Sequence, residues 1–303
     1  MLKISGAGCI IDKILERQKE GLGLERQKRI AAIHDISGIG KCSLTAALPI
    51  ISAAGIEAAA MPTAVLSTHT GNIEGYTYRD LTCDLPAIAK HWKSLGIGFD
   101  GIYSGFLGST EQVEMVCDFI DEFAGEDCVI LVDPAMADSG RMYTTFDDDF
   151  VSEMAKLCGK ADIIVPNLTE AAFLLGEEYV EPPYKSDYIE DLLKRLADIG
   201  PKKIVLTGVC FSNDEIGCAV YNNGAIHYRF SEKYDGIYYG TGDIFASALI
   251  GAYMRGKDIS ESADIALEFT CAAIKRTHDA ATDTRFGVNF EQGIGDFIKK
   301  LGG

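Results

Sequence analysis

A run of five apolar residues, Cys128 to Val132, most constrains the fold of this 303-residue chain. A strand that is apolar on both faces must be covered on both faces, which is typical of a parallel sheet with helices on each side. The run ends in Asp133-Pro134. A carboxylate at the end of a buried strand is costly unless it has a partner or a chemical role. The feature therefore predicts an α/β fold with polar groups at the carboxyl ends of its strands.

The same alternation of apolar strand, polar turn and helix recurs along the chain. Strands are predicted at 30–33, 56–65, 101–106, 128–132, 161–165 and 203–208. Helices are predicted at 42–54, 86–95, 110–123, 171–175, 244–252 and 263–277. A hairpin is predicted around Asn222-Asn223-Gly224, because this turn separates two short apolar runs. The pattern predicts one three-layer αβα sandwich with a mainly parallel central sheet, over residues 29–303.

Residues 1–28 differ from the rest of the chain. The pentapeptide Leu-Glu-Arg-Gln-Lys occurs at 15–19 and again at 24–28. One short duplication does not make a repeat architecture. Two interpretations stay open for this N-terminal extension: a helix that docks on the domain or on a second subunit, and a loose tail.

The formal net charge of −17 disfavours binding to nucleic acid or to anionic lipid by bulk attraction. An anionic ligand would need a local pocket of N–H groups, cations or metal. The nine cysteines form no C-x-x-C pair and are expected to be reduced thiols. The longest apolar stretch, 44–66, is interrupted by prolines and a glycine, so no membrane span is expected. We expect a cytoplasmic protein without a signal peptide.

A glycine-rich tetrapeptide, Gly240-Thr241-Gly242-Asp243, precedes an apolar helical run. Backbone N–H groups at a helix start attract anions, and the helix dipole adds about half a positive charge there. An aspartate in such a place repels phosphate, but it can take a proton from a hydroxyl that attacks phosphorus. The alternative is that Thr241 or Asp243 only caps the helix.

Further polar residues follow the predicted strands. In an open parallel sheet these strand ends share one edge, where ligands bind. The residues placed there are Asp35, Ser37, His69, Thr70, Asp133, Asn167, Glu170, Thr207 and Asp243. Their joint occurrence predicts a small-ligand site.

Two nucleotide-binding motifs are absent from the first glycine-rich loop. Gly38-Ile39-Gly40 is followed by Ser43 where the dinucleotide fingerprint needs its third glycine. A P-loop would need glycine at 35 and Ser or Thr at 42, but the chain has Asp35 and Cys42. A nicotinamide-dependent dehydrogenase is therefore disfavoured.

Together these motifs resemble the pyridoxal kinase branch of the ribokinase-like superfamily, over residues 29–303. The most specific element is Gly240-Thr-Gly-Asp243 followed by Ile-Phe-Ala, which is similar to the anion-hole and catalytic-base motif of that superfamily. The other matching segments are Ser67-Thr-His-Thr-Gly71, Gly105-Phe106, Asp133-Pro134 with Asp138, Met142-Tyr143, and Pro166-Asn167 with Glu170.

Two positions depart from the pyridoxal kinase pattern. Asp35 stands where many of these enzymes have a serine, and its setting leans toward the Asp-Ser-Ser-Gly loop of hydroxymethylpyrimidine kinases. Phe106 lacks the phenol of the usual tyrosine. Both positions belong to the part of the site that would bind the substrate ring, so they bear on which ring is bound and do not alter the expectation of phosphoryl transfer.

The resemblance implies an ATP-dependent kinase for the 5′-hydroxymethyl group of pyridoxal, pyridoxamine or pyridoxine. Asp243 would be the base, and the N–H groups of Gly240, Thr241 and Gly242 would hold the transferring phosphoryl. The implied ATP and phosphate contacts are Thr207, Asn167, Glu170, Asp138 and Tyr143. The implied ring pocket is Asp35, Ser37, His69, Thr70 and Phe106.

The resemblance further implies Mg²⁺ near Asp133 and Glu170, a monovalent cation such as K⁺, and a homodimer. Two alternatives remain: a hydroxymethylpyrimidine (phosphate) kinase on the same fold, and a catalytically silent binding protein of that fold. The intact Gly240–Asp243 motif disfavours the silent protein.

Overall fold

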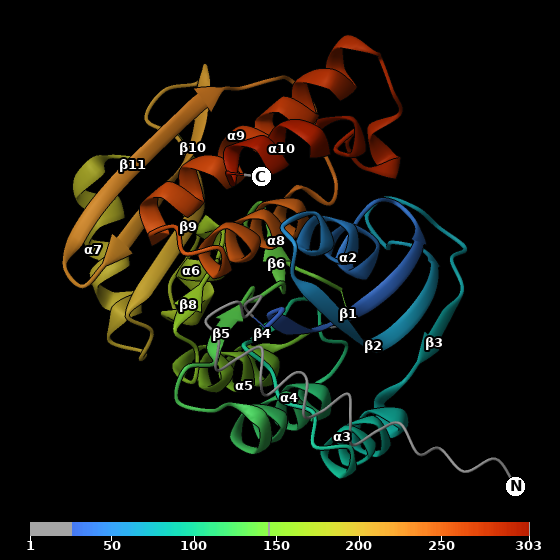
Figure 1. The fold of residues 1–303 in the computed structure, drawn as a ribbon. Helices are drawn as coiled ribbons and strands as arrows, with labels where there is room; N and C mark the ends of the chain where they lie inside the picture. The colour runs from blue at the N-terminus through green and yellow to red at the C-terminus, as the bar shows by residue number, and fades with distance from the viewer. Residues whose placement is uncertain (1–25, 145, 303) are drawn as a thin grey trace, which may run out of the picture.

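The computed structural model describes residues 26–144 and 146–302. Its centre is a nine-stranded sheet in the order β11-β10-β9-β8-β5-β4-β1-β2-β3 (Figure 1). The strands are β1 (Arg29–Ile39), β2 (Glu57–Thr68), β3 (Tyr78–Asp80), β4 (Gly101–Ser104), β5 (Val129–Val132), β8 (Ile163–Ile164), β9 (Lys203–Val209), β10 (Glu215–Asn222) and β11 (Ala225–Glu232). Neighbours from β2 through β9 pair in parallel, and β3, β10 and β11 pair antiparallel.

Helices cover both faces of the sheet, as the buried strands require. They are α2 (Ser43–Ala53), α3 (Leu85–Ser94), α4 (Thr110–Phe123), α5 (Asp148–Gly159), α6 (Leu168–Leu174), α7 (Ser186–Ala197), α8 (Thr241–Met254), α9 (Ile259–Asp279) and α10 (Ile294–Lys300). One apolar core lies under α2, α8, α9 and α10, and the other lies under α3 to α7 (Figure 1). The predicted αβα sandwich with a mainly parallel sheet is confirmed.

The strand order reverses beside β1, and this reversal indicates where along the sheet a ligand would bind. The chain passes from β1 to β2 on one side, and then returns through β4 to the other side of β1. In open α/β sheets such a switch point opens a crevice at the carboxyl ends of the strands. The pairing of β1 with β4 ends at Ile33, whereas its pairing with β2 continues to Ile39. The last residues of β1 therefore have one strand neighbour only.

One sequence prediction about a strand end was wrong. The segment 34–40 was predicted as a loop, but β1 runs through it to Ile39, so Asp35 and Ser37 lie on the strand. Its long pairing with β2 keeps the strand going past Gly38. The register shifts between His34 and Ile36, which is a bulge of the kind that reorients side chains near sites. Thr207 lies near the end of β9, within the strand predicted at 203–208.

A small second sheet follows β5. It consists of β6 (Ala137–Asp138) and β7 (Arg141–Met142), joined through Ser139 and Gly140, which both have positive φ. This hairpin follows the end of β5 closely in the chain. Gly140 N donates to Thr169 Oγ1 at 3.0 Å, which ties the hairpin to the start of α6.

The described residues bear on two expectations about compartment. The cysteines between residues 26 and 302 are all free thiols, as predicted. No helix in the described part of the chain is long and apolar enough to cross a membrane. The predicted N-terminal extension lies almost wholly outside the described residues.

Candidate active site

The start of α8 brings Gly240, Thr241, Gly242 and Asp243 to the ligand edge. The N-cap is Gly240, with φ +74°. Thr241 Oγ1 donates to the carbonyl of Tyr238 at 3.2 Å instead of accepting a bond from the helix. The backbone N–H of Ser43, at the start of α2, lies close enough to the Asp243 carboxyl to lower its pKa. Neither side chain acts as the N-cap that the alternative interpretation requires.

Gly240 is needed for close approach between two chain segments. A Cβ at this position would lie 2.4 Å from the carbonyl oxygen of Lys41. Gly287 meets the same turn from the other side, where its Cβ would lie 2.4 Å from Gly40 O. The turn between β1 and α2 is therefore held between the start of α8 and the segment around Gly287. These contacts fix where the N–H groups of α8 point.

Asp243 has the electrostatics of a base that works near neutral pH. Burial raises its pKa to about 7, and the charge of Asp35 acts in the same direction. The N–H of Ser43 lowers the pKa and only partly compensates. Its side chain keeps 17% exposure, so a ligand can reach it. A carboxylate with this pKa can accept a proton from an alcohol.

Asp35 is held by two serines. Ser37 Oγ donates to Asp35 Oδ2 at 2.9 Å, and Ser43 Oγ donates to Oδ1 at 2.6 Å. Asp35 is 4% exposed. Burial raises its pKa, whereas the two hydroxyl hydrogen bonds lower it. The predicted ring-pocket residues Asp35 and Ser37 therefore form one fixed group with Ser43 at the end of β1.

His69, another predicted ring-pocket residue, is held in place by its neighbours. Its ring stacks on Tyr239 with centroids 5.0 Å apart, and its Nε2 contacts the carbonyl of Arg285. Gly40 allows the ring to lie there, because a Cβ would come 2.2 Å from His69 Cδ2. Thr70, the next residue, is exposed and makes no side-chain hydrogen bond among the described residues.

Asp133 and Glu170 form a buried acidic pair. Burial raises the pKa of both carboxyls well above the usual range. The charge of Asp243 adds to the effect at Asp133, and the charge of Asp133 adds to it at Glu170. Gly242 lies next to Asp133, since its Cβ would be 3.9 Å from Asp133 Oδ2. Burial and mutual repulsion therefore both favour the protonated form of this pair.

Glu170 and Asn167 also have a structural role at the start of α6. Asn167 Oδ1 accepts the N–H groups of Thr169 and Glu170, and Glu170 Oε2 accepts Asn167 N at 2.8 Å. This is a capping box. Glu170 Oε1 also accepts the N–H of Met136 at 3.2 Å. Glu170 therefore holds together the turn that presents the predicted phosphate contacts.

The remaining predicted ATP contacts lie around this turn. Thr207 pairs with Asn167 through a parallel bridge, and its Oγ1 donates to Pro166 O at 3.3 Å. Asp138 and Tyr143 lie on or after the β6–β7 hairpin and are exposed. Partial burial raises the pKa of the Tyr143 phenol well above its usual range. Four nearby negative charges act in the same direction, those of Glu170, Asp138, Asp133 and Asp243. The hairpin, the α6 turn and the start of α8 thus face one region.

Phe106 follows β4 on the opposite side of the switch point from Asp35. It is half-buried, and its ring lies 5.6 Å from that of Phe146. Its carbonyl lies 3.5 Å from the hydroxyl of Thr63 on β2. An aromatic surface at this place suits a flat ring.

The sequence profile of the phosphomethylpyrimidine kinase family matches residues 40–287. This match covers well over half of the chain. The chain belongs to this kinase family. The family profile does not separate enzymes of vitamin B6 from enzymes of hydroxymethylpyrimidine, so the kinase activity is supported and the substrate is not.

Several solved kinase structures are similar to the chain over most of its length. A Bacteroides thetaiotaomicron protein assigned as a phosphomethylpyrimidine kinase, crystallised with pyridoxal, is 38% identical, with a TM-score of 0.85 over 90% of this chain and 96% of that chain. Pyridoxal kinase from Lactobacillus plantarum is 31% identical, with a TM-score of 0.83 over 90% and 98%. The pyridoxine kinase of Bacillus subtilis is 28% identical over 60% of this chain and 66% of its own length.

Three residues that lie beside predicted site residues are absent from the set predicted from the sequence. His34 lies fully buried beside Asp243, Ser43 contacts both Asp35 and Asp243, and Tyr239 stacks on His69. In the sequence, Ser43 is noticeable only because it stands where the dinucleotide-binding fingerprint needs its third glycine. His34 precedes Asp35 in the sequence and Tyr239 precedes Gly240, and these positions next to predicted site residues could have indicated that they lie at the site.

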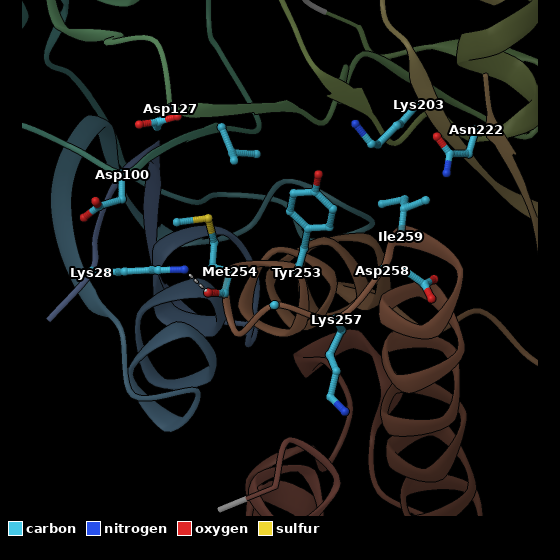
Figure 2. Close-up of a pocket in the computed structure, with 12 residues that line it drawn as sticks. Lys28, Asp100, Asp127, Lys203, Asn222, Tyr253, Met254, Lys257, Asp258 and Ile259 are labelled. Carbon is cyan, nitrogen blue, oxygen red and sulfur yellow. Dashed lines mark hydrogen bonds between the residues drawn. The ribbon is translucent and has the colours of Figure 1, made fainter. Parts of the chain in front are cut away.

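A separate cavity of about 550 Å³ lies at the opposite edge of the kinase's sheet (Figure 2). It is lined by Lys28, Lys203, Tyr253, Lys257 and Asp258, among others. Lys28 donates to the carbonyl of Met254, and Lys257 pairs with Glu261. This cavity contains none of the predicted site residues.

Proposed function

We propose that this kinase phosphorylates the 5′-hydroxymethyl group of a vitamin B6 ring alcohol, using ATP as the phosphoryl donor. The observation that carries the proposal is Asp243, with its pKa raised to about 7, at the start of α8 and beside the switch point. The likeness to a pyridoxal kinase at 31% identity supports the choice of substrate. Pyridoxal in the crystals of the Bacteroides thetaiotaomicron relative supports it further.

In the proposed reaction each part of the site has a separate task. The ring lies between the Asp35 group and Phe106, with its hydroxymethyl group toward Asp243. Asp243 accepts the hydroxyl proton as the oxygen attacks the γ-phosphorus, and the bond from phosphorus to the β,γ-bridging oxygen breaks. The N–H groups of Gly240, Thr241 and Gly242 stabilise the charge on the transferring phosphoryl. ADP leaves with the bridging oxygen.

The donor set fits magnesium. Asp133 and Glu170 are buried carboxylates whose raised pKa values would fall beside a cation. Within residues 26–144 and 146–302, no three His, Cys, Asp or Glu side chains gather into a metal site. Magnesium commonly takes one or two carboxylates and completes its shell with phosphate oxygens and water. When bound, the ion would neutralise charge on the nucleotide phosphates. A monovalent cation and a homodimer belong to the same proposal.

The magnesium assignment predicts that Asp133→Ala weakens turnover and that excess magnesium partly restores it. Asp133 makes no side-chain hydrogen bond in the described structure, so its loss should leave the α6 turn intact. Glu170→Ala is expected to lose turnover and also melt lower, because it removes the capping box. The measurement is turnover against magnesium concentration, with a melting curve for each variant. If Asp133→Ala loses activity with an unchanged magnesium dependence, the assignment is wrong.

A hydroxymethylpyrimidine kinase is the second candidate, because Asp35 leans toward the loop of those enzymes and the family profile carries their name. Competition between pyridoxal and hydroxymethylpyrimidine at equal concentration, with limiting ATP, separates the two. We expect pyridoxal phosphate as the main product. A pyrimidine phosphate as the main product would overturn the choice of ring. No ATP consumption with either ring would favour the silent binding protein.

A further inference from the structure

His34 is a buried histidine that the proposed reaction does not yet use. It lies on β1 at the bulge, with 0% exposure. Its Nδ1 lies 3.9 Å from Asp243 Oδ1. Neither ring nitrogen has a hydrogen-bond partner among the described residues. A buried polar group without a partner costs free energy and calls for an explanation.

The neighbours of His34 hold its ring in place but do not form hydrogen bonds with its nitrogens. The edge of the ring meets Tyr103 on β4, with centroids 4.3 Å apart and an interplanar angle of 79°. Gly105 leaves the room that the ring fills, because a Cβ there would lie 2.2 Å from His34 Nδ1. The hydroxyls of Tyr103 and Ser247, both fully buried, also lack partners. In the described part of the chain, Asp243 is the one residue with a carboxylate oxygen within 4 Å of a ring nitrogen of His34.

We propose that His34 is a positioning residue, whose Nδ1–H donates to one oxygen of Asp243 and directs the other oxygen to the substrate hydroxyl. This inference rests on the proposed role of Asp243 as the base. A separation of 3.9 Å is too long for a hydrogen bond. Catalytic hydrogen bonds are often long without substrate and shorten in the reactive complex. A small rotation of the carboxylate is enough to form the bond.

The protonation state of His34 agrees with this role. Burial lowers its pKa to about 3, so the imidazole is neutral at physiological pH and carries one proton. A carboxylate facing Nδ1 favours the tautomer with the proton on that nitrogen. The neutral ring donates a hydrogen bond without adding a charge that would quench the basicity of Asp243. His34 thus orients the base and takes no proton from the substrate.

Three substitutions separate positioning from packing. In His34→Asn the amide lies close to the place of Nδ1, and in His34→Gln it lies close to that of Nε2. His34→Leu fills a similar volume without a donor. We expect His34→Leu and His34→Gln to lower kcat about 10- to 100-fold, since a displaced base costs about this much. His34→Asn should stay within about fivefold of the parent. KM for ATP and pyridoxal should change little in all three.

The melting temperature gives an independent readout. Replacing an unpartnered buried polar group with an apolar one of similar size is neutral or stabilising. We therefore expect His34→Leu to melt at or above the parent temperature while kcat falls. A merely structural histidine predicts a lower melting temperature and no difference between the asparagine and glutamine variants.

The double variant tests the coupling to Asp243. In an Asp243→Asn background, His34→Leu should cause little further loss, because both changes disable the same group. The inference is overturned if His34→Leu keeps kcat within twofold of the parent, if the asparagine and leucine variants lose kcat equally, or if the two losses multiply. If Asp243→Asn alone leaves turnover unchanged, the proposed base itself is wrong, and that failure is seen before any His34 variant is made.

Discussion

Asp243→Asn is expected to lower turnover by about a hundred- to ten-thousand-fold with little change in the fold. Asparagine keeps the size of the side chain but cannot accept the proton of the attacking hydroxyl. Most of the rate enhancement in phosphoryl transfer comes from positioning and charge stabilisation, so the base supplies this part only. ATP affinity should stay the same or improve, because one negative charge near the phosphates is removed. Turnover and nucleotide affinity are measured on one preparation.

The same substitution should raise stability at alkaline pH. The folded protein keeps the Asp243 proton up to a pKa of about 7, whereas the unfolded chain loses it near 3.8. Stability therefore falls as pH rises between these values and is lowest above pH 7, by an amount on the order of 2–4 kcal/mol. Asp243→Asn escapes this penalty. It should melt higher than the parent at pH 8, and the difference should shrink at pH 5.

The pH dependence of the parent activity follows from the same pKa. The carboxylate must be ionised to act as a base, so kcat/KM should fall about tenfold per pH unit below about pH 7. If Asp243 only capped the helix, asparagine would cap equally well and leave both turnover and melting temperature near the parent values. Turnover within a few-fold of the parent would show that Asp243 is not the base.

Gly240→Ala is expected to have the second largest effect, on both stability and turnover. Alanine at φ +74° costs about 1–2 kcal/mol, and its Cβ would lie 2.4 Å from the carbonyl oxygen of Lys41. The turn between β1 and α2 must move away from α8. We expect a loss on the order of 3 kcal/mol and a fall of about 5–10 °C in melting temperature.

Turnover of Gly240→Ala should fall about a hundredfold at temperatures where the variant is folded. The N–H groups at the start of α8 shift from their positions, and one such donor is worth about this factor. Gly256→Ala is the matched control at the other end of α8. Gly256 has φ +89°, but its Cβ would meet nothing within 4 Å. The control should lose about 1 kcal/mol and keep its turnover. Equal effects in the two variants would contradict the packing argument.

Patterns local in sequence predicted most of the fold. The apolar strands and the Asn222-Asn223-Gly224 turn were enough for the sheet and its β10–β11 hairpin. The continuation of β1 beyond Ile33 was missed, because it depends on long-range pairing with β2, which maintains the strand despite Gly38. The helices α5 and α7 were not predicted. For α7 a signal was present, since Ile189, Leu192, Leu193 and Leu196 follow helical spacing.

The site residues were predicted as a group, but their partners were not. Asp35, Asp133 and Asp243 were recognised as polar groups near strand ends. Ser43 lies beside two of them, and His34 packs on Tyr103 of β4; both arrangements depend on how α2 and β4 pack around the switch point. Asn167 was predicted as a phosphate contact, and its capping box with Glu170 emerged only from the structure.

The central claim is that the γ-phosphoryl group of ATP passes to the 5′-hydroxyl of a vitamin B6 alcohol. The most direct test incubates the purified chain with ATP, magnesium, and a panel of vitamin-like ring alcohols, and identifies products by mass spectrometry. We expect pyridoxal, pyridoxamine or pyridoxine to gain one phosphate at the 5′ position, with ADP formed in equal amount. ADP formation without any phosphorylated ring, or phosphate on hydroxymethylpyrimidine alone, would contradict the account.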